Sequence, residues 1–316
     1  VLLLAMVLLP QSAAAAPTDT PTPVVTDDVE VWSAGAGLLY WGSNCFADEF
    51  NPFAVLKRKP AAGGAERTIE SINDTGLCVT HLSQRSTGAG LYYYDYSQGR
   101  IERMPLGEPY IPKTIKALDS AQIPTRRDLL LAGSYLYWTN GIDKVLRVRA
   151  DGSGDVQTVA NTSAPATDVT VVGNVAYYTD GGGVWSVSVD CATLPCAGVG
   201  QFAAFGANTF GYGLLYQLIG GIRGDYRLYW VEQSGNPPNT SYQIRYRACN
   251  QLTVCNILPL PTPTTFYGST TNWRIGNPLL AGGSLYWTEL DGSNNNNGDV
   301  KRRAVNAAEP GAETLA

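Results

Sequence analysis

The stretch Leu136-Tyr137-Trp138-Thr139-Asn140, which follows the glycine-containing turn Ala132-Gly133-Ser134, is the clearest copy of an aromatic phrase that recurs along the chain. Six copies align on one tyrosine, and these equivalent residues are Tyr40, Tyr92, Tyr137, Tyr177, Tyr229 and Tyr286. Successive copies lie 40 to 57 residues apart. Short β segments that repeat about every 40 to 50 residues are the signature of propeller blades.

The third copy predicts one blade residue by residue. Its four antiparallel strands are expected at residues 128–132, 135–139, 144–149 and 156–160, with Gly-, Asn- and Asp-rich turns between them. The other copies align with this pattern, and the outer strand of the fifth is expected at Ile257-Leu258. The sequence therefore predicts an all-β, six-bladed β-propeller over residues 28–316. Its blades are expected at residues 28–72, 77–118, 128–160, 168–204, 212–260 and 276–316.

The bulk composition suits a turn-rich exported protein. Charged residues make up 16% of the chain and the net charge is −5, so no overall attraction to nucleic acid is expected. Residues 1–16 combine an apolar run with Ala14 and Ala16 in an A-x-A arrangement, which predicts a partial signal peptide. Residues 17–27 form a Pro/Thr-rich linker. No later apolar run is long enough for a membrane span, so we expect a secreted or extracytoplasmic protein.

Six cysteines in an exported chain favour disulfides over zinc ligands, and only one histidine is present to assist a metal. Cys191 with Cys196, and Cys249 with Cys255, bracket short loops between predicted strands. Cys45 and Cys78 remain, and both fall on the same face of the predicted ring. Three bridges are therefore expected.

The phrases Tyr137-Trp138-Thr139-Asn140, Tyr177-Tyr178-Thr179-Asp180 and Tyr286-Trp287-Thr288-Glu289, with the segment from Arg147 to Ser153, resemble the YWTD repeats of the low-density-lipoprotein-receptor type of six-bladed propeller. The resemblance covers residues 28–316 and implies the fold, although only Asp180 keeps the terminal Asp of the motif. No flanking EGF-like cysteine module accompanies it. The resemblance therefore favours an exported bacterial relative over a lipoprotein receptor.

Loop length varies between the blades. The segments between the second and third strands are longest in blades 1, 5 and 6, at residues 44–53, 232–242 and 289–299. These blades are neighbours in a closed ring, so their loops are expected to form one rim on the face where the chain crosses between blades. Its expected binding residues are Phe46, Phe50, Phe53, Tyr242, Glu289, Asp291 and Asp299, with the aromatic side chains exposed. Drift in loop length is the alternative interpretation, and the sequence leaves both open.

A second candidate site lies at the mouth of the central channel. Asp128, Asp168 and Asn277 each stand nine residues before a repeat tyrosine, where the first strand of a blade begins. They are candidates for an oxygen-lined site for a sugar or a calcium ion. Their turn chemistry favours the alternative, in which they hydrogen-bond the turns between blades. Residues 291–299 also have oxygen-bearing side chains at calcium-loop spacing, but they lack the final acidic ligand, which favours a plain loop tip.

Two classes of function follow. The first is a binding or scaffolding module for a protein or glycan partner, with no cofactor. The second is a metal-dependent hydrolase or lyase of the lactonase-like kind that six-bladed propellers support. The sequence contains no G-x-S-x-G or H-E-x-x-H motif and no evident pairing of a nucleophile with a base. It therefore favours binding over catalysis.

Overall fold

Twenty-five β-strands and no helix make up the regular structure of the part of the chain that is described. This computed structural model describes residues 31–35, 38–43, 55–60, 65, 67–71, 79–82, 90–95, 98–105, 111–124, 129–218, 226–235, 240–249, 262–269, 273–276, 278–281, 284–291, 298–305 and 313–314. Within these ranges no helix has the length and hydropathy needed to cross a bilayer. The predicted signal peptide and linker lie outside them.

The strands form antiparallel sheets in chain order. Sheet 1 contains β1 (Val31–Gly35), β2 (Leu38–Ser43), β3 (Val55–Pro60) and β4 (Arg67–Ser71). Sheet 2 contains β5 (Val79–Leu82), β6 (Leu91–Asp95), β7 (Arg100–Met104) and β8 (Lys113–Ala117). Sheet 3 contains β9 (Leu130–Ala132), β10 (Tyr135–Thr139), β11 (Lys144–Arg149) and β12 (Gln157–Asn161).

The second half of the chain repeats this plan. Sheet 4 contains β13 (Asp168–Val172), β14 (Val175–Asp180), β15 (Gly183–Ser188) and β16 (Gly200–Ala204). Sheet 5 contains β17 (Thr209–Leu218), β18 (Tyr226–Ser234), β19 (Ser241–Cys249) and β20 (Thr264–Ser269). In sheet 6, β21 (Trp273–Ile275) and β22 (Leu279–Ala281) both pair with β23 (Ser284–Asp291), which β24 (Gly298–Ala304) and β25 (Glu313–Thr314) follow.

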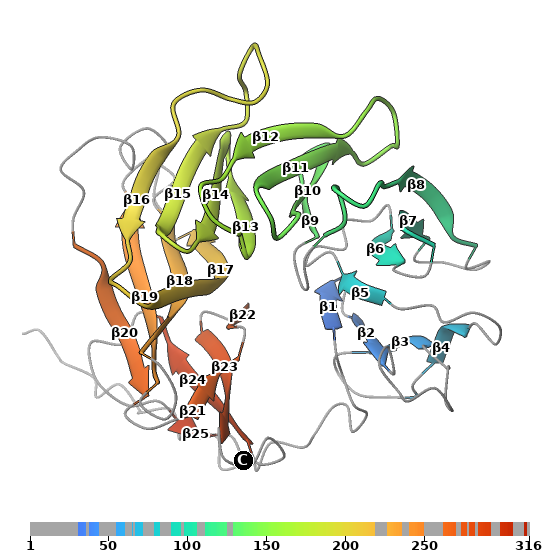
Figure 1. The fold of residues 1–316 in the computed structure, drawn as a ribbon. Helices are drawn as coiled ribbons and strands as arrows, with labels where there is room; N and C mark the ends of the chain where they lie inside the picture. Colours follow the sequence, from blue (N-terminus) through green and yellow to red (C-terminus); the bar gives the residue numbers. More distant parts are fainter. Residues whose placement is uncertain are drawn as a thin grey trace, which may run out of the picture.

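The aromatic phrase lies on the second strand of each sheet and supplies the core between sheets. Trp138 packs with Tyr94 between sheets 2 and 3, whereas Phe202 of sheet 4 lies edge-on to Trp230 of sheet 5. Phe266 of sheet 5 meets Trp287 of sheet 6 in the same way. Large aromatic side chains bury the area that adjacent sheets need in order to pack. Figure 1 shows the result, six sheets arranged in chain order around an open centre with the first strands nearest to it.

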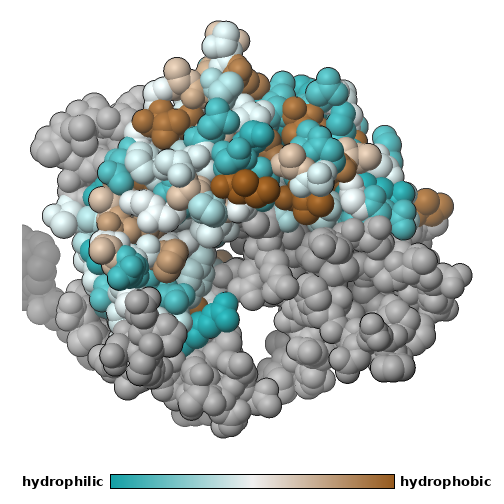
Figure 2. Space-filling view, in the orientation of Figure 1, coloured by the Kyte–Doolittle hydropathy of each residue, from teal (hydrophilic) through white to brown (hydrophobic). Residues whose placement is uncertain are grey.

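Strand order defines two faces of this arrangement. The connections from second to third strands and from one sheet to the next lie on one face, which we call the crossing face. The connections from first to second and from third to fourth strands lie on the opposite, hairpin face. Figure 2 shows small apolar patches interspersed with polar ones over the coloured residues of the visible side. No large apolar patch appears among them.

One predicted strand is wrong. The fourth strand of sheet 5 is β20, at Thr264–Ser269, and not the dipeptide Ile257-Leu258, which lies outside the described residues. Three prolines, Pro259, Pro261 and Pro263, stand just before β20. Proline has no N–H to donate to a ladder, so a strand that pairs in register begins only after them.

Candidate functional site

The pairing between the second and third strands extends farther in sheets 5 and 6 than in sheet 3. Counted from the repeat tyrosine, the ladder continues for two residues in sheet 3, to the pair Thr139 and Val145. In sheet 5 it continues for five, to the pair Ser234 and Ser241. At about 3.3 Å per residue, the longer ladder projects about 10 Å farther on the crossing face.

The first strands of sheets 5 and 6 extend with these ladders. In sheet 5, β17 pairs with the end of β18 through Thr209, Phe210 and Gly211. In sheet 6, β21 pairs with the end of β23, where Trp273 meets Asp291. We call these projecting ladders the wall; it comprises residues 209–211, 232–234, 241–243, 273–275, 289–291 and 298–299. In each of the two sheets, the first, second and third strands therefore all contribute to the wall.

Among the described side chains of the wall, Phe210 is an exposed aromatic one. It is 54% exposed and lies on β17, the edge strand of sheet 5. Gln233 lies opposite it on β18 and Tyr242 lies opposite Gln233 on β19, so all three side chains occupy one side of sheet 5. Tyr242, which the sequence predicted to be exposed, is only 8% exposed and packs with Ile275 in the core between sheets 5 and 6. The prediction of its exposure is therefore corrected.

The base of the wall is held by close contacts. The hydroxyl of Tyr212 on β17 donates a hydrogen bond of 2.5 Å to the carbonyl of Ile275 on β21. Gly213 follows with φ of +67°, and a Cβ there would lie 2.6 Å from Cδ of Pro278. Only glycine fits this backbone at this approach. These contacts fix the first strands of sheets 5 and 6 against each other.

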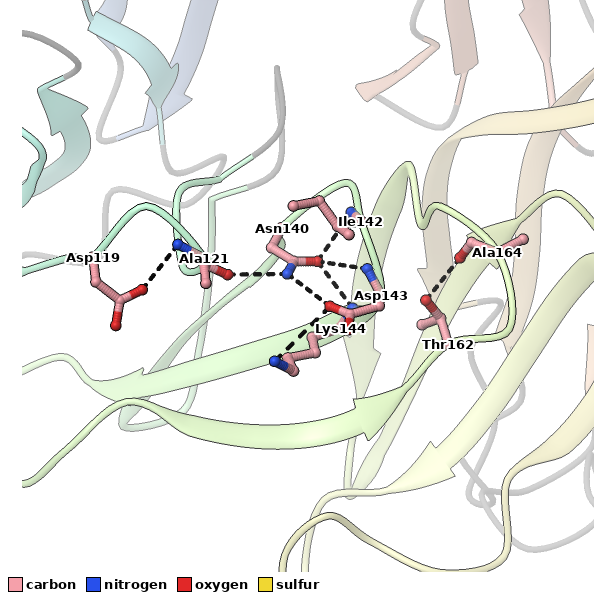
Figure 3. A network of polar contacts seen from close by, with 8 residues as sticks. All are labelled: Asp119, Ala121, Asn140, Ile142, Asp143, Lys144, Thr162 and Ala164. Carbon is pink, nitrogen blue, oxygen red and sulfur yellow. Dashed lines mark hydrogen bonds and ion pairs between the residues drawn. The ribbon is translucent and has the colours of Figure 1, made fainter.

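In sheets 3 to 6, the residue three places after the repeat tyrosine supports the turn or ladder that follows it. In sheet 3 this residue is Asn140, which is 6% exposed. Its Oδ1 accepts hydrogen bonds from the amides of Ile142, Asp143 and Lys144 at 3.1, 3.0 and 2.9 Å. Its Nδ2 donates to the carbonyl of Ala121, 3.0 Å away, and thereby joins the connection between sheets 2 and 3 (Figure 3).

Asp180 has the same role in sheet 4. Its Oδ1 accepts hydrogen bonds from the amide of Gly182 at 2.7 Å and from Nε1 of Trp185 at 2.6 Å. Burial raises the pKa of Tyr178, and the charge of Asp180 raises it further. The last residue of the YWTD-like phrase, Asn140 or Asp180, thus stabilises the short turn between the second and third strands of sheets 3 and 4.

In sheets 5 and 6, the residue three places after the repeat tyrosine is a glutamate, whose side chain is longer than those of Asn140 and Asp180. Glu232 accepts a hydrogen bond from Nε1 of Trp230 at 2.8 Å and forms an ion pair with Arg245 at 3.3 Å. Glu289, a predicted binding residue, is 4% exposed and forms an ion pair with Lys301 at 3.4 Å. Arg245 and Lys301 have equivalent register positions, opposite Trp230 and Trp287. Both pairs therefore lie at the base of the wall, where the side chains of Arg245 and Lys301 are partly buried.

The channel-mouth candidates are described only in part. Asp168 is half-buried; its Oδ1 accepts a hydrogen bond from the amide of Val169 at 2.8 Å and its Oδ2 accepts one from Leu214 at 2.5 Å. It therefore joins the first strands of sheets 4 and 5. Within the described ranges, no group of three His, Cys, Asp or Glu side chains is placed to hold a metal.

For several predicted site residues, the structure describes the backbone alone or does not describe the residue. Asp291 ends β23 and Asp299 pairs with Glu289, which places both backbones on the wall, while their side chains are not described. The predicted site residues that lie outside the described residues altogether are Phe46, Phe50, Phe53, Asp128 and Asn277. Their roles stay predictions.

The disulfide prediction is confirmed for one pair. Cys191 and Cys196 are bonded across the connection between β15 and β16, on the hairpin face. Cys249 is also disulfide-bonded. Cys45, Cys78 and Cys255 lie outside the described residues, so the other two pairings stay predictions.

No protein-family model and no curated protein sequence matches the chain. Solved structures do. Virginiamycin B lyase from Staphylococcus aureus is 12% identical, with a TM-score of 0.58 over 90% of this chain and 82% of that chain. A chain in the mitotic checkpoint complex is 11% identical, with a TM-score of 0.54 over 94% of this chain and 85% of that one.

A puromycin-hydrolysing peptidase of Mycobacterium tuberculosis is similar as well. It is 10% identical with a TM-score of 0.57, and the match covers 91% of this chain and 53% of that chain, so this chain spans about half of the peptidase. At these identities the likeness shows a β-propeller-like fold and nothing of activity. Membership of the YWTD family stays a prediction.

Proposed function

We propose that this chain is an exported six-bladed β-propeller that binds a protein or glycan partner through the crossing face, at the wall of sheets 5 and 6. Each sheet is one blade in this proposal. Residues 44–53 of sheet 1, the third part of the predicted rim, lie outside the described residues. The observation that carries the proposal is the projection of Phe210, an exposed aromatic side chain, from a braced three-stranded extension.

The composition of the wall fits recognition better than catalysis. Gln233 lies opposite Phe210 and is partly accessible, whereas Ser234 and Arg274 are accessible on the other sides of β18 and β21. An exposed aromatic side chain beside an amide, on an extension that also carries a hydroxyl and a guanidinium group, fits the apolar centre and polar rim of binding surfaces. The described carboxylates of the region are, in contrast, occupied: Glu232 and Glu289 pair with basic side chains. Their charges are therefore balanced within the protein, although Oε1 of Glu289 has no hydrogen-bond partner among the described residues.

The export proposal rests on the disulfides and on the amino-terminal sequence. The bond between Cys191 and Cys196 is of the kind that forms in oxidising compartments. Residues 1–16 serve as a partial signal peptide and residues 17–27 as a linker in this proposal. Mass spectrometry of the secreted protein tests it: a mature amino terminus near residue 17 supports export, and a retained apolar segment contradicts it.

A binding screen tests the function. The purified protein, Phe210→Asp and Ile142→Asp are applied in parallel to a glycan array and to a panel of purified exported proteins. Ile142 is a matched control, because it is 60% exposed on the crossing face of sheet 3, away from the wall. We expect hits that Phe210→Asp loses at least about tenfold and Ile142→Asp keeps. The absence of any hit, or hits insensitive to Phe210→Asp, contradicts the proposal.

A calcium titration tests the alternative function, a metal-dependent enzyme. If the chain is a metal-dependent hydrolase or lyase, calcium binds stoichiometrically, and Asp128→Ala and Asp168→Ala abolish that binding. Since both oxygens of Asp168 already accept main-chain hydrogen bonds, we expect no such calcium binding. Stoichiometric calcium binding that depends on Asp168 would move the assignment from binding to catalysis.

A further inference from the structure

Arg247 on β19 is a buried cation without a hydrogen-bonded partner for two of its nitrogens among the described residues. The residue is 6% exposed, and its Nε and Nη1 are both buried and unpartnered. Its guanidinium carbon lies 4.8 Å from the ring centroid of Phe202 in sheet 4. Burial lowers the pKa of Arg247, but an arginine side chain keeps its charge in proteins. A buried charge without a counter-charge is costly, so a missing partner is indicated.

Arg303 on β24 gives a matched comparison. Arg247 lies opposite Leu228 and Arg303 lies opposite Leu285, which are equivalent positions of the repeat. Arg303 also stacks on an aromatic ring of the preceding sheet, with its guanidinium carbon 4.7 Å from the centroid of Phe266. Unlike Arg247, however, Arg303 donates a hydrogen bond from Nη1 to the carbonyl of Phe266. Both sites share the stacking and a buried Nε without a hydrogen-bond partner, and the unpartnered Nη1 distinguishes Arg247.

Hydroxyl groups share the space between sheets 4 and 5 with Arg247. Tyr177 of sheet 4 and Tyr226 of sheet 5 meet hydroxyl to hydroxyl. Ser186, which is 5% exposed, lies opposite Tyr177 and therefore faces the same way. The described carboxylate on this side of sheet 5 is Glu232, four residues along β18 from Leu228 and paired with Arg245. The hydroxyl of Ser186 already donates to the carbonyl of Gly200 at 3.3 Å, so the tyrosine pair supplies the remaining hydroxyl donor of this region. Among the described residues, no carboxylate forms an ion pair with Arg247.

We propose that Arg247 binds a small oxyanion, of the carboxylate, phosphate or sulfate class, between sheets 4 and 5. Phe202 covers one face of the guanidinium, so its N–H groups are left to donate in the plane, where two oxygens of one anion fit the fork. β19 runs from the crossing face at Ser241 to the hairpin face at Cys249, and Arg247 lies near its end. The site is therefore near the hairpin face, opposite the wall, and does not depend on the function proposed for the wall.

Anion titrations at constant ionic strength test the proposal. Sodium sulfate, phosphate and acetate are each added against sodium chloride, and thermal unfolding and tryptophan fluorescence are recorded. Trp230 is a suitable reporter, because its ring lies 6.2 Å from that of Phe202. We expect saturable stabilisation and a saturable change in fluorescence by at least one oxyanion. The anion that acts most strongly identifies which member of the class the site takes.

Arg247→Met and Arg303→Met separate the site from general salt effects, since sulfate and phosphate also stabilise proteins non-specifically. We expect Arg247→Met to lose the saturable response and Arg303→Met to keep it. Arg247→Met should also unfold at a higher temperature than the wild type in chloride, because an uncompensated buried charge is removed. Should Arg247→Met fail to fold, Arg247→Lys replaces it, with an apparent dissociation constant raised at least about tenfold. Equal responses in wild type and the Arg247 variant, or no saturable response in wild type, overturn the proposal.

Discussion

The hydroxyl of Tyr212 hydrogen-bonds the carbonyl of Ile275, and this contact joins sheets 5 and 6 at the base of the wall. Tyr212 belongs to β17 and Ile275 to β21, the two first strands that extend onto the crossing face. The same region places glycine at residue 213, against Pro278. The wall is thus a rigid continuation of two neighbouring sheets and not a pair of independent loops.

Replacement of Tyr212 by Phe tests this brace. The substitution removes one hydrogen bond and leaves the ring, so we expect a loss of about 0.5 to 1.5 kcal/mol in the free energy of unfolding. Amide hydrogen exchange in β21 should accelerate more than exchange in β13, which lies in sheet 4. Uniform acceleration over both strands would show that the bond supports the whole ring and not the wall.

The Asn140 network makes a second prediction. Asn140→Ala removes the acceptor of three turn amides and the donor to Ala121, and we expect a loss of about 2 to 4 kcal/mol. Asn140→Asp keeps the acceptor but loses the Nδ2 donor to Ala121 and to Oδ1 of Asp143, and it sets a second carboxylate beside Asp143. Its loss should still be smaller than that of Asn140→Ala, because the three turn amides keep their acceptor. Urea unfolding of both variants measures the order. Equal losses would mean that the bonds donated by Nδ2 to Ala121 and Asp143, and not the three turn amides, carry the stabilisation.

The ion pair within the wall of sheet 6 makes a third prediction. Lys301→Met leaves the carboxylate of Glu289 buried without its counter-charge, and we expect a loss of about 2 to 3 kcal/mol. Adding Glu289→Gln to this variant should restore more than half of that loss. The control is Lys144→Met, whose partner Asp143 is exposed and 3.9 Å away, with an expected loss below about 1 kcal/mol. A double variant no more stable than Lys301→Met would contradict this interpretation.

A pH dependence follows from Asp151. Hydrogen bonds from the side chain and amide of Ser153, and then one from Arg149, lower the pKa of Asp151 from 3.8 to about 2. Because the pKa is lower in the folded state, the stabilisation is complete above 3.8 and is lost as the pH falls through about 2. Asp151→Asn should therefore differ from wild type in stability above about pH 4 and converge with it near pH 2.

The carboxyl carbon of Asp151, followed by NMR titration, measures this shift directly. Ser153→Ala should move the midpoint upward, since the Ser153 side chain is the largest cause of the shift. A wild-type midpoint near the ordinary value of 3.8 would show that the contacts with Ser153 and Arg149 do not form in solution.

Much of the fold could be predicted because its determinants are local. Turn residues such as Gly133 and Gly141 and the buried aromatic run around Tyr137 define one sheet without reference to the rest of the chain. The outer strand of sheet 5 could not be predicted in this way. Ile257-Leu258 has the expected apolar character, but the prolines that follow delay the pairing to Thr264.

The candidate site was harder to predict, because side-chain orientation depends on ladder register. Tyr242 was expected at an exposed loop, whereas the ladder continues to Ser241 and turns Tyr242 to the same buried side as Ile244. Phe210 was missed, although the alternation of aromatic residues and glycine from Phe210 to Gly213 signals a first strand that begins early. The pairing of Glu289 with Lys301 also needs the fold, since twelve residues separate them along the chain.

Hydroxyl-radical footprinting with the strongest ligand from the binding screen tests the central claim most directly. Phe210 and Ile142 are both exposed on the crossing face, so both are oxidised readily in the free protein. We predict that the bound ligand protects Phe210 and leaves Ile142 unchanged. Protection of Ile142 without protection of Phe210 would contradict the assignment of the binding site to the wall.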